Sequence, residues 1–195
     1  MGKQQNYVVE VEDLTIAYDA KPVLWDIDLK IPKGKLMAVV GPNGAGKTTL
    51  IKAMLGLLKP VTGVVRFSNG DAGTHKNLIG YVPQSGSVDW DFPATVQDVV
   101  LMGCYGKLGW IRRPRKADIE LTKQTLAKVG MEKYASRQIS RLSGGQQQRV
   151  FLARALAQEA EVYFMDEPLK GVDAQTERAI AALWKELKEQ GKTIV

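Results

Sequence analysis

The chain has 195 residues, of which 45% are apolar, so it can bury a core and form one or two domains. Its longest apolar stretches, "LMAVV" and "AIAALW", are far shorter than the roughly 18 to 20 residues that cross a membrane, and no secretory signal is visible, so we expect neither a membrane-spanning helix nor export. The net charge is +6, and the single cysteine, Cys104, excludes an internal disulfide and favours a reducing cytoplasm.

The first part of the chain favours β-structure. Apolar and charged side chains alternate over residues 9–12 and 25–31, which is the period of half-buried antiparallel strands. "KLMAVVG" at 35–41 then predicts a fully buried strand, and after a glycine turn "TTLIKAMLGLL" at 48–58 predicts a helix. This order of strand, loop and helix is typical of a nucleotide-binding unit.

The stretch "GPNGAGKTT" at 41–49 matches the pattern of a phosphate-binding loop. Glycines at 44 and 46 let backbone N–H groups close around phosphates, and the N-terminus of the next helix adds positive potential. We expect Lys47 to bind the β- and γ-phosphates of ATP and Thr48 to ligate Mg²⁺. A glycine turn with a chance Gly-Lys-Thr is the alternative, but the flanking strand and helix favour a phosphate loop. The expected ATP-binding residues are Gly41, Pro42, Asn43, Gly44, Ala45, Gly46, Lys47, Thr48 and Thr49.

The middle of the chain turns from strands to helices. "GVVRFS" and "LIGYVPQ" predict two more strands, after which residues 86–160 favour helices. "ATVQDVVLMG" begins with Thr95 and Asp98 at the spacing of a capping box, and "RKADIELTKQTLAKVG" ends on a glycine that stops a helix. We interpret residues 86–160 as an inserted helical subdomain.

A basic segment lies within this middle part. Residues 103–116, "GCYGKLGWIRRPRK", contain five basic side chains and no acidic one. We interpret the segment as a solvated loop, with docking on a partner protein or on lipid headgroups as alternatives. Nucleic acid is disfavoured as a partner because Tyr105 and Trp110 lack the repeated interleaving of a base-stacking surface.

A second glycine-rich stretch, "LSGGQQQRV" at 142–150, opens another helix. A hydroxyl and exposed N–H donors at a helix N-terminus favour a second anion site. Because this stretch is far from the first loop in the sequence, we expect two chains to face each other head to tail, each binding the γ-phosphate held by the other. A glycine helix start without a ligand is the alternative. The expected ATP contacts are Ser143, Gly144, Gly145 and Gln146.

The stretch "VYFMDE" at 162–167 predicts a buried strand that ends at two acids. We expect Asp166 to hold Mg²⁺ and Glu167 to be the general base for an attacking water. Gln84, which ends "LIGYVPQ", is expected to orient that water or bind the metal. Two solvated acids after a strand are the alternative, which the phosphate loop disfavours. Residues 173–191 then predict an amphipathic helix, and "KTIV" begins another strand.

Together, "GPNGAGKTT", "YVPQ", "LSGGQ", "VYFMDEP" and "GVD" resemble the phosphate loop, glutamine loop, signature, magnesium strand and dimer loop of ABC-type ATPases. The resemblance covers nearly the whole chain. It implies an α/β fold, a P-loop nucleoside-triphosphatase cassette with an antiparallel β subdomain and an inserted helical subdomain. A single ABC ATPase domain would then span 1–195, with the nucleotide-binding core and β subdomain at 1–85 and 161–195 and the helical signature subdomain at 86–160.

The resemblance also implies roles that the residues alone do not give. It implies that Tyr18 stacks on adenine, although Tyr18 could equally be a strand-face residue, and that Asp173 lies at the dimer seam. Residues 88–110 are similar to the ATP-binding subunits of manganese, zinc or iron importers. The resemblance further implies ATP and Mg²⁺ as cofactors. It implies as partners a second ATPase subunit in a homodimer, a polytopic membrane permease and, indirectly, a metal-binding receptor, but no nucleic acid. It also implies a location at the inner face of the cell membrane.

Three features depart from the family pattern. Cys104 stands where the importer branch usually has an arginine, and Leu169 and Lys170 stand where an aromatic and a small polar residue are expected. The family also places a switch histidine just after the strand that begins "KTIV", whereas the sequence ends at Val195 and its one histidine, His75, is expected on the surface. We therefore expect a C-terminally truncated chain that binds ATP but hydrolyses it slowly.

Three other functions stay open at this point. A soluble translation factor commonly joins two cassettes, whereas this chain has one phosphate loop, and a DNA-repair ATPase would split its cassette with a long coiled coil that this sequence lacks. A catalytically impaired nucleotide-binding module gains support from the absent histidine. We favour the ATP-hydrolysing subunit of an ABC transporter that imports a divalent metal ion such as manganese, zinc or iron through a separate membrane subunit.

Overall fold

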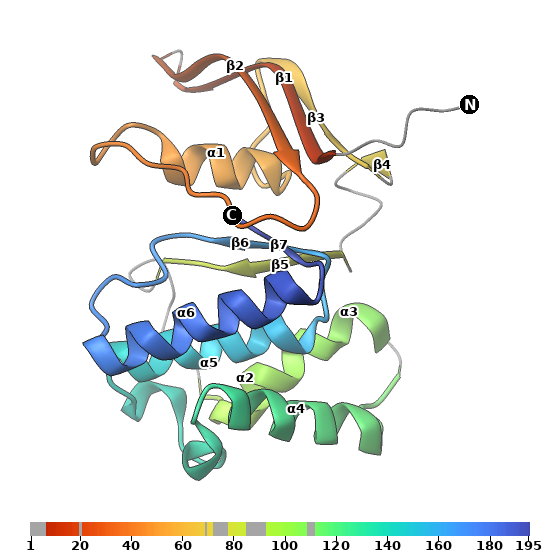
Figure 1. Cartoon of the computed structure of the whole chain (residues 1–195), viewed down its shortest axis with the longest axis vertical. Helices are drawn as coiled ribbons and strands as arrows, with labels where there is room; N and C mark the ends of the chain where they lie inside the picture. Colours follow the sequence, from red (N-terminus) through yellow and green to blue (C-terminus); the bar gives the residue numbers. More distant parts are fainter. Residues whose placement is uncertain (1–6, 20, 69, 72–77, 85–92, 109–111) are drawn as a thin grey trace.

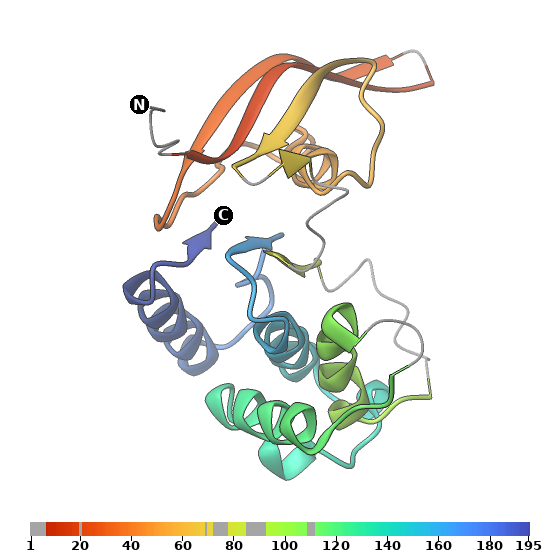
Figure 2. The ribbon, with the colours of Figure 1, turned by 90° about the vertical axis from the view of Figure 1, so that its right-hand side faces the viewer.

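The computed structural model describes all residues except 1–6, 20, 69, 72–77, 85–92 and 109–111. Its elements lie in layers (Figure 1): an antiparallel sheet, then helix α1, then a parallel sheet, and then the remaining helices. Figure 2 shows the antiparallel sheet curving over α1. The α/β cassette expected from the sequence is confirmed.

The antiparallel sheet has the strand order β2-β1-β3-β4. The predicted alternation is confirmed in β1, where Val9 and Val11 are buried in the core. In β2 the pairing with β1 shifts register near Asp26, whose φ is 50°, and Trp25 is 70% exposed. The bulge therefore takes Trp25 out of the buried series that we expected. The strands are β1 (Tyr7–Tyr18), β2 (Lys21–Pro32), β3 (Thr62–Phe67) and β4 (Gly70–Asp71).

The parallel sheet has the order β5-β6-β7. All four residues of β6 are buried, as predicted. Val162 and Phe164 belong to the core shared with α1 and the antiparallel sheet, whereas Tyr163 and Met165 belong to the core formed with the helices. Both faces of this sheet are thus covered, which explains the continuous apolar run. The strands are β5 (Ile79–Val82), β6 (Val162–Met165) and β7 (Thr193–Ile194).

The prediction of a fully buried strand over 35–41 is wrong. Leu36 makes a single parallel bridge to Ile194, supported by a 2.8 Å hydrogen bond from the Met37 N–H to the Ile194 carbonyl. The stretch is otherwise irregular, and Val40 is 87% exposed. Its apolar residues indicated burial, but a strand also needs a partner, and β7 reaches only to Met37 within the described structure.

Helix α1 (Lys47–Met54) lies between the two sheets, and α5 (Gly144–Ala157) and α6 (Ala174–Glu189) cover the opposite face of the parallel sheet (Figure 1). α1 is shorter than predicted because Gly56, with a φ of 69°, ends it. The Leu57 N–H donates to the Lys52 carbonyl at 2.9 Å, as in a Schellman motif. None of the described helices is long and apolar enough to span a bilayer.

The helices of the middle part surround α5. They are α2 (Val96–Leu101), α3 (Tyr105–Leu108) and α4 (Lys116–Lys128), with short 3-10 turns η3 (Met102–Cys104), η4 (Glu132–Tyr134) and η5 (Ile139–Arg141). The capping box before α2 is confirmed, since the Asp98 N–H donates to the Thr95 hydroxyl and the Thr95 N–H donates to the Asp98 carboxylate. Cys104 is fully buried in the core beside α5, where burial raises the pKa of its thiol.

Gly103 marks the closest approach of η3 to α5. A Cβ on Gly103 would lie 2.3 Å from the Arg154 carbonyl oxygen and 3.0 Å from the Ala157 Cβ. We therefore expect Gly103→Ala to lower the free energy of unfolding by about 1–3 kcal/mol, the usual cost of overpacking. Urea denaturation measures this, with Ala117→Ser on the exposed face of α4 as the control. Equal stability of both variants would show that the two elements can move apart without cost.

Candidate functional site

The phosphate loop connects residues 35–40 to α1. Gly44 and Gly46 have φ values of 84° and 89°, a conformation that side chains other than glycine rarely adopt. A Cβ on Gly46 would lie 2.7 Å from Leu24 Cδ2, so the Leu24 side chain would have to move. No side chain caps the first turn of α1 in the described structure. Backbone N–H groups there are available to an anion, as a phosphate site requires.

Lys47, the first residue of α1, folds back over this loop. Its Nζ donates to the carbonyl oxygens of Gly41 at 2.8 Å and Pro42 at 2.9 Å. The Ala45 N–H donates to the Pro42 carbonyl at 3.2 Å, which tightens the loop further. The ammonium group therefore lies against the phosphate loop.

Thr48 and Asp166 meet although they are 118 residues apart. The Thr48 hydroxyl donates to Asp166 Oδ1 at 3.0 Å. Asp166 follows β6 and is 3% exposed, and its Oδ2 has no hydrogen-bond partner among the described atoms. A buried carboxylate oxygen without a partner is costly unless a cation binds it, so the two side chains fit the ligand set of a hard divalent metal ion.

Glu167, the next residue, accepts two donors on the same oxygen. Gln84 Nε2 and Lys170 Nζ each lie 2.7 Å from Glu167 Oε2. Hydrogen bonding from Lys170, assisted by the charge of Lys47 and the Gln84 amide, lowers the pKa of the Glu167 carboxyl below its usual value. A glutamate with its ordinary pKa is already ionised at neutral pH, and these donors stabilise that charged form, which is the form that accepts a proton.

These groups line one open cavity of about 320 Å³. Its lining residues are Val23, Asn43, Gly44, Gly46, Lys47, Thr48, Thr49, Gln84, Glu167 and Lys170. Polar donors from the loop, Thr48, Gln84 and the Glu167 carboxylate thus converge on one space, which suits a polyphosphate and a water. Asp166, bonded to Thr48, lines the adjoining cavity.

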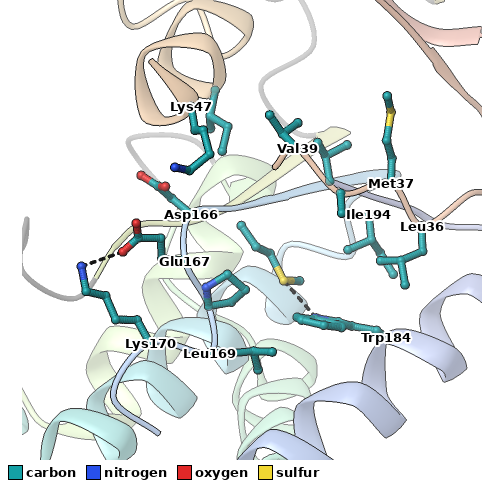
Figure 3. A pocket seen from close by; sticks show the side chains of 15 residues that line it. Leu36, Met37, Val39, Lys47, Asp166, Glu167, Leu169, Lys170, Trp184 and Ile194 are labelled. Carbon is teal, nitrogen blue, oxygen red and sulfur yellow. Dashed lines mark hydrogen bonds and ion pairs between the residues drawn. The ribbon is translucent and has the colours of Figure 1, made fainter. Parts of the chain in front are cut away.

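A second, mostly apolar cavity of about 410 Å³ adjoins the first. In Figure 3, Lys47, Asp166, Glu167 and Lys170 lie on one side of it, and Leu36, Met37, Val39, Trp184 and Ile194 lie on the other. Trp184 Nε1 donates to the sulfur of Met165 at 3.1 Å. Lys47, Glu167 and Lys170 line both cavities. The charged side chains of the apolar cavity therefore lie at its edge nearest the phosphate loop.

The second glycine-rich stretch does not line either cavity. Ser143 caps α5 with a capping box, in which its hydroxyl accepts from the Gln146 N–H and the Gln146 side chain accepts from the Ser143 N–H at 3.0 Å. A Cβ on Gly144 would meet no described atom within 4 Å. Within one chain this stretch is therefore separate from the cavity of the phosphate loop, as we expected.

Other expected residues lie outside the cavity. Tyr18, at the end of β1, is 47% exposed and absent from its lining. Asp173 caps α6 within the chain, accepting from the Thr176 N–H at 2.9 Å and the Thr176 hydroxyl at 2.8 Å. Within the basic segment, Lys107 pairs with Glu159. The expectations for His75 and Trp110 lie outside the described residues.

Sequence reasoning missed two residues of the cavity. Val23 lies in β2 at a position with no chemical signature. Lys170 was noticed only as a departure from the family pattern. Its spacing of three residues from Glu167 was the available signal, because a turn places such residues side by side.

Comparison with known proteins supports these observations. Residues 24–170 match the family model described as ABC transporter. The chain is 60% identical over 189 residues to the manganese transport system ATP-binding protein MntB of Bacillus subtilis (97% of this chain, 76% of the relative). It is 57% identical over 189 residues to the zinc transport system ATP-binding protein TroB of Treponema pallidum (97% and 71%).

Solved structures agree. The fold is similar to a nucleotide-free ATP-binding cassette from an ABC transporter, with a TM-score of 0.82, 26% identity and coverage of 96% of this chain and 79% of the other. It is also similar to CbiO1 from Clostridium perfringens, part of an ABC transporter complex, with a TM-score of 0.78, 30% identity and coverage of 97% and 77%.

Proposed function

Because this chain belongs to the ABC transporter family, as an ATP-hydrolysing subunit of a multi-component transporter, we propose that it powers the import of a divalent metal ion such as manganese, zinc or iron. The observation that carries the proposal is the cavity where Lys47 of the phosphate loop faces Glu167. The names of the two relatives, one for manganese and one for zinc, support this choice of cargo. The cargo itself does not touch the ATP site.

ATP is proposed to bind with its phosphates in the loop and Lys47 on the β- and γ-oxygens. Thr48, Asp166 and Gln84 are the proposed ligands of Mg²⁺, and the unpartnered Oδ2 of Asp166 supports this assignment. When bound, Mg²⁺ neutralises charge on the phosphate oxygens. Tyr18 is the proposed adenine contact, although in one chain it lies outside the cavity lining.

Glu167 is the proposed general base. Its carboxylate lies in the same cavity as Lys47 and Thr48, and the ion pair with Lys170 stabilises its charged form. It would accept a proton from the water that attacks the γ-phosphate, while Gln84 orients that water. The contacts from Gln84 and Lys170 both end on Oε2 of Glu167, so Oε1 is the proposed acceptor of that proton.

Two chains are proposed to act together. Ser143, Gly144, Gly145 and Gln146 of one chain would bind the γ-phosphate held by the other, which explains why they are remote from the phosphate loop of their own chain. A Cβ on Gly145 would lie 3.9 Å from Val172, so the signature is close to the loop that carries Asp173. Residues 86–160 would be the helical subdomain that moves this surface, with 1–85 and 161–195 as the nucleotide-binding core.

The proposed partners follow from this arrangement. They are a second copy of this chain, a polytopic membrane permease and, indirectly, a metal-binding receptor, with the chain at the inner face of the cell membrane. Soluble ABC ATPases of translation or DNA repair have no such membrane partner. A catalytically impaired nucleotide-binding module would bind ATP without turnover.

Mass spectrometry of the proteins that co-purify with the tagged chain from gently solubilised native membranes separates these functions. We expect a polytopic membrane subunit, with a metal-binding receptor beside it. Ribosomal or DNA-repair proteins without a membrane partner would overturn the transport function and leave the ATP site intact.

A further inference from the structure

Lys170 is held beside Glu167 by both its backbone and its side chain. Its N–H donates to the Glu167 carbonyl at 3.0 Å, and its Nζ lies 2.7 Å from Glu167 Oε2 (Figure 3). The two residues therefore form a turn closed by an ion pair just after β6. A small polar side chain at position 170 is too short to make this ion pair.

The ion pair fixes one oxygen of the carboxylate. Gln84 Nε2 reaches the same Oε2 at 2.7 Å, so two donors from different parts of the chain converge on it. A carboxylate held at one oxygen retains its other oxygen for a proton. The geometry thus orients Glu167 without blocking it.

The charged side chain of Lys170 also lines the cavity of the phosphate loop. Lys170 and Glu167 both line the space into which the phosphate loop opens. A polyphosphate there would push the negatively charged carboxylate of Glu167 out of position, and the ion pair with Lys170 holds it in place. Lys47 already supplies the cation of the phosphate loop, whereas Lys170 forms an ion pair with Glu167.

We propose that Lys170 is a positioning residue for ATP hydrolysis, which holds the carboxylate of Glu167 by Oε2 so that Oε1 can accept the proton of the attacking water. This inference rests on the proposed role of Glu167. The side chain of Lys170 is 61% exposed, so solvent screens the pair and its effect is moderate.

The test compares steady-state ATP hydrolysis by the wild type, Lys170→Ala and Lys170→Arg, each purified with the membrane partner. We expect Lys170→Ala to lower kcat by about two- to fivefold, the range that corresponds to a solvent-exposed ion pair, with KM for ATP unchanged. Lys170→Arg should restore most of kcat because it keeps the charge. Lys128→Ala is the matched control, because Lys128 forms a comparably exposed ion pair with Glu186 at 2.9 Å, outside both cavities.

Two further measurements separate positioning from a structural role. In a Glu167→Gln background, Lys170→Ala should have no added effect on single-turnover hydrolysis, because its target is gone. Raising the salt concentration should bring the wild-type kcat at saturating ATP toward that of Lys170→Ala, since salt screens the ion pair.

The contrary results are distinct. An unchanged or increased kcat in Lys170→Ala, with Glu167→Gln impaired, would overturn this inference and leave the proposed function in place. A raised KM with unchanged kcat would instead make Lys170 a nucleotide ligand and overturn the inference. Wild-type hydrolysis by Glu167→Gln would overturn both the inference and the proposed role of Glu167.

Discussion

Glu167→Gln is expected to slow ATP hydrolysis by about 10² to 10⁴-fold, the usual contribution of a positioned acid or base. The amide has the shape of the carboxylate but cannot take a proton from water at neutral pH. ATP binding should persist because the proposed phosphate contacts are the loop and Lys47, which line the same cavity and stay unchanged. Phosphate release measures hydrolysis, and size-exclusion chromatography with ATP should show a trapped dimer.

The matched control for this variant is Glu186→Gln. Glu186 is 46% exposed and pairs with Lys128, so its replacement removes an equal charge without touching the cavity. We expect it to hydrolyse ATP at the wild-type rate. Equal rates for Glu167→Gln and the wild type would refute the assignment of the general base.

Lys47→Ala is expected to weaken ATP binding by about 10- to 150-fold. This range corresponds to the loss of one charged hydrogen bond of about 1.5–3 kcal/mol. Titration with a fluorescent ATP analogue measures the Kd. In the described structure Lys47 bonds only loop carbonyls, so the variant should keep the wild-type unfolding midpoint.

Lys59→Ala serves as the control for Lys47→Ala. Lys59 follows α1, is exposed, and does not line the cavity. Its replacement lowers the net charge equally and should leave the Kd unchanged. If both variants weaken binding alike, general charge attraction rather than the phosphate loop holds the nucleotide.

Local sequence signals predicted the elements that depend on near neighbours. The capping box of Thr95 and Asp98 and the apolar run of β6 are both present. The prediction of a strand over 35–41 was wrong because strand formation depends on a partner distant in the sequence, and this stretch makes one bridge, to Ile194. The prediction that Trp25 is buried was wrong because a bulge at Asp26 shifts the register of β2, which alternation alone does not reveal.

The motifs identified residues of the candidate site, but not which of them are in contact. Thr48 and Asp166 were each assigned to the metal from their own motifs, and the structure brings them within 3.0 Å. Gln84 and Glu167 likewise meet across 83 residues. The ion pair of Lys170 belongs to no motif, because it depends on the turn after β6, and only its spacing of three residues from Glu167 indicated it.

Uptake of radioactive manganese and zinc by cells tests the central claim most directly, that ATP hydrolysis at this site drives metal import. Cells would carry the wild-type chain, Glu167→Gln or no copy, with membrane association of the chain verified in each. We predict that uptake of at least one metal falls in Glu167→Gln cells to the level of cells without the chain. Wild-type uptake of both metals by Glu167→Gln cells would contradict the claim.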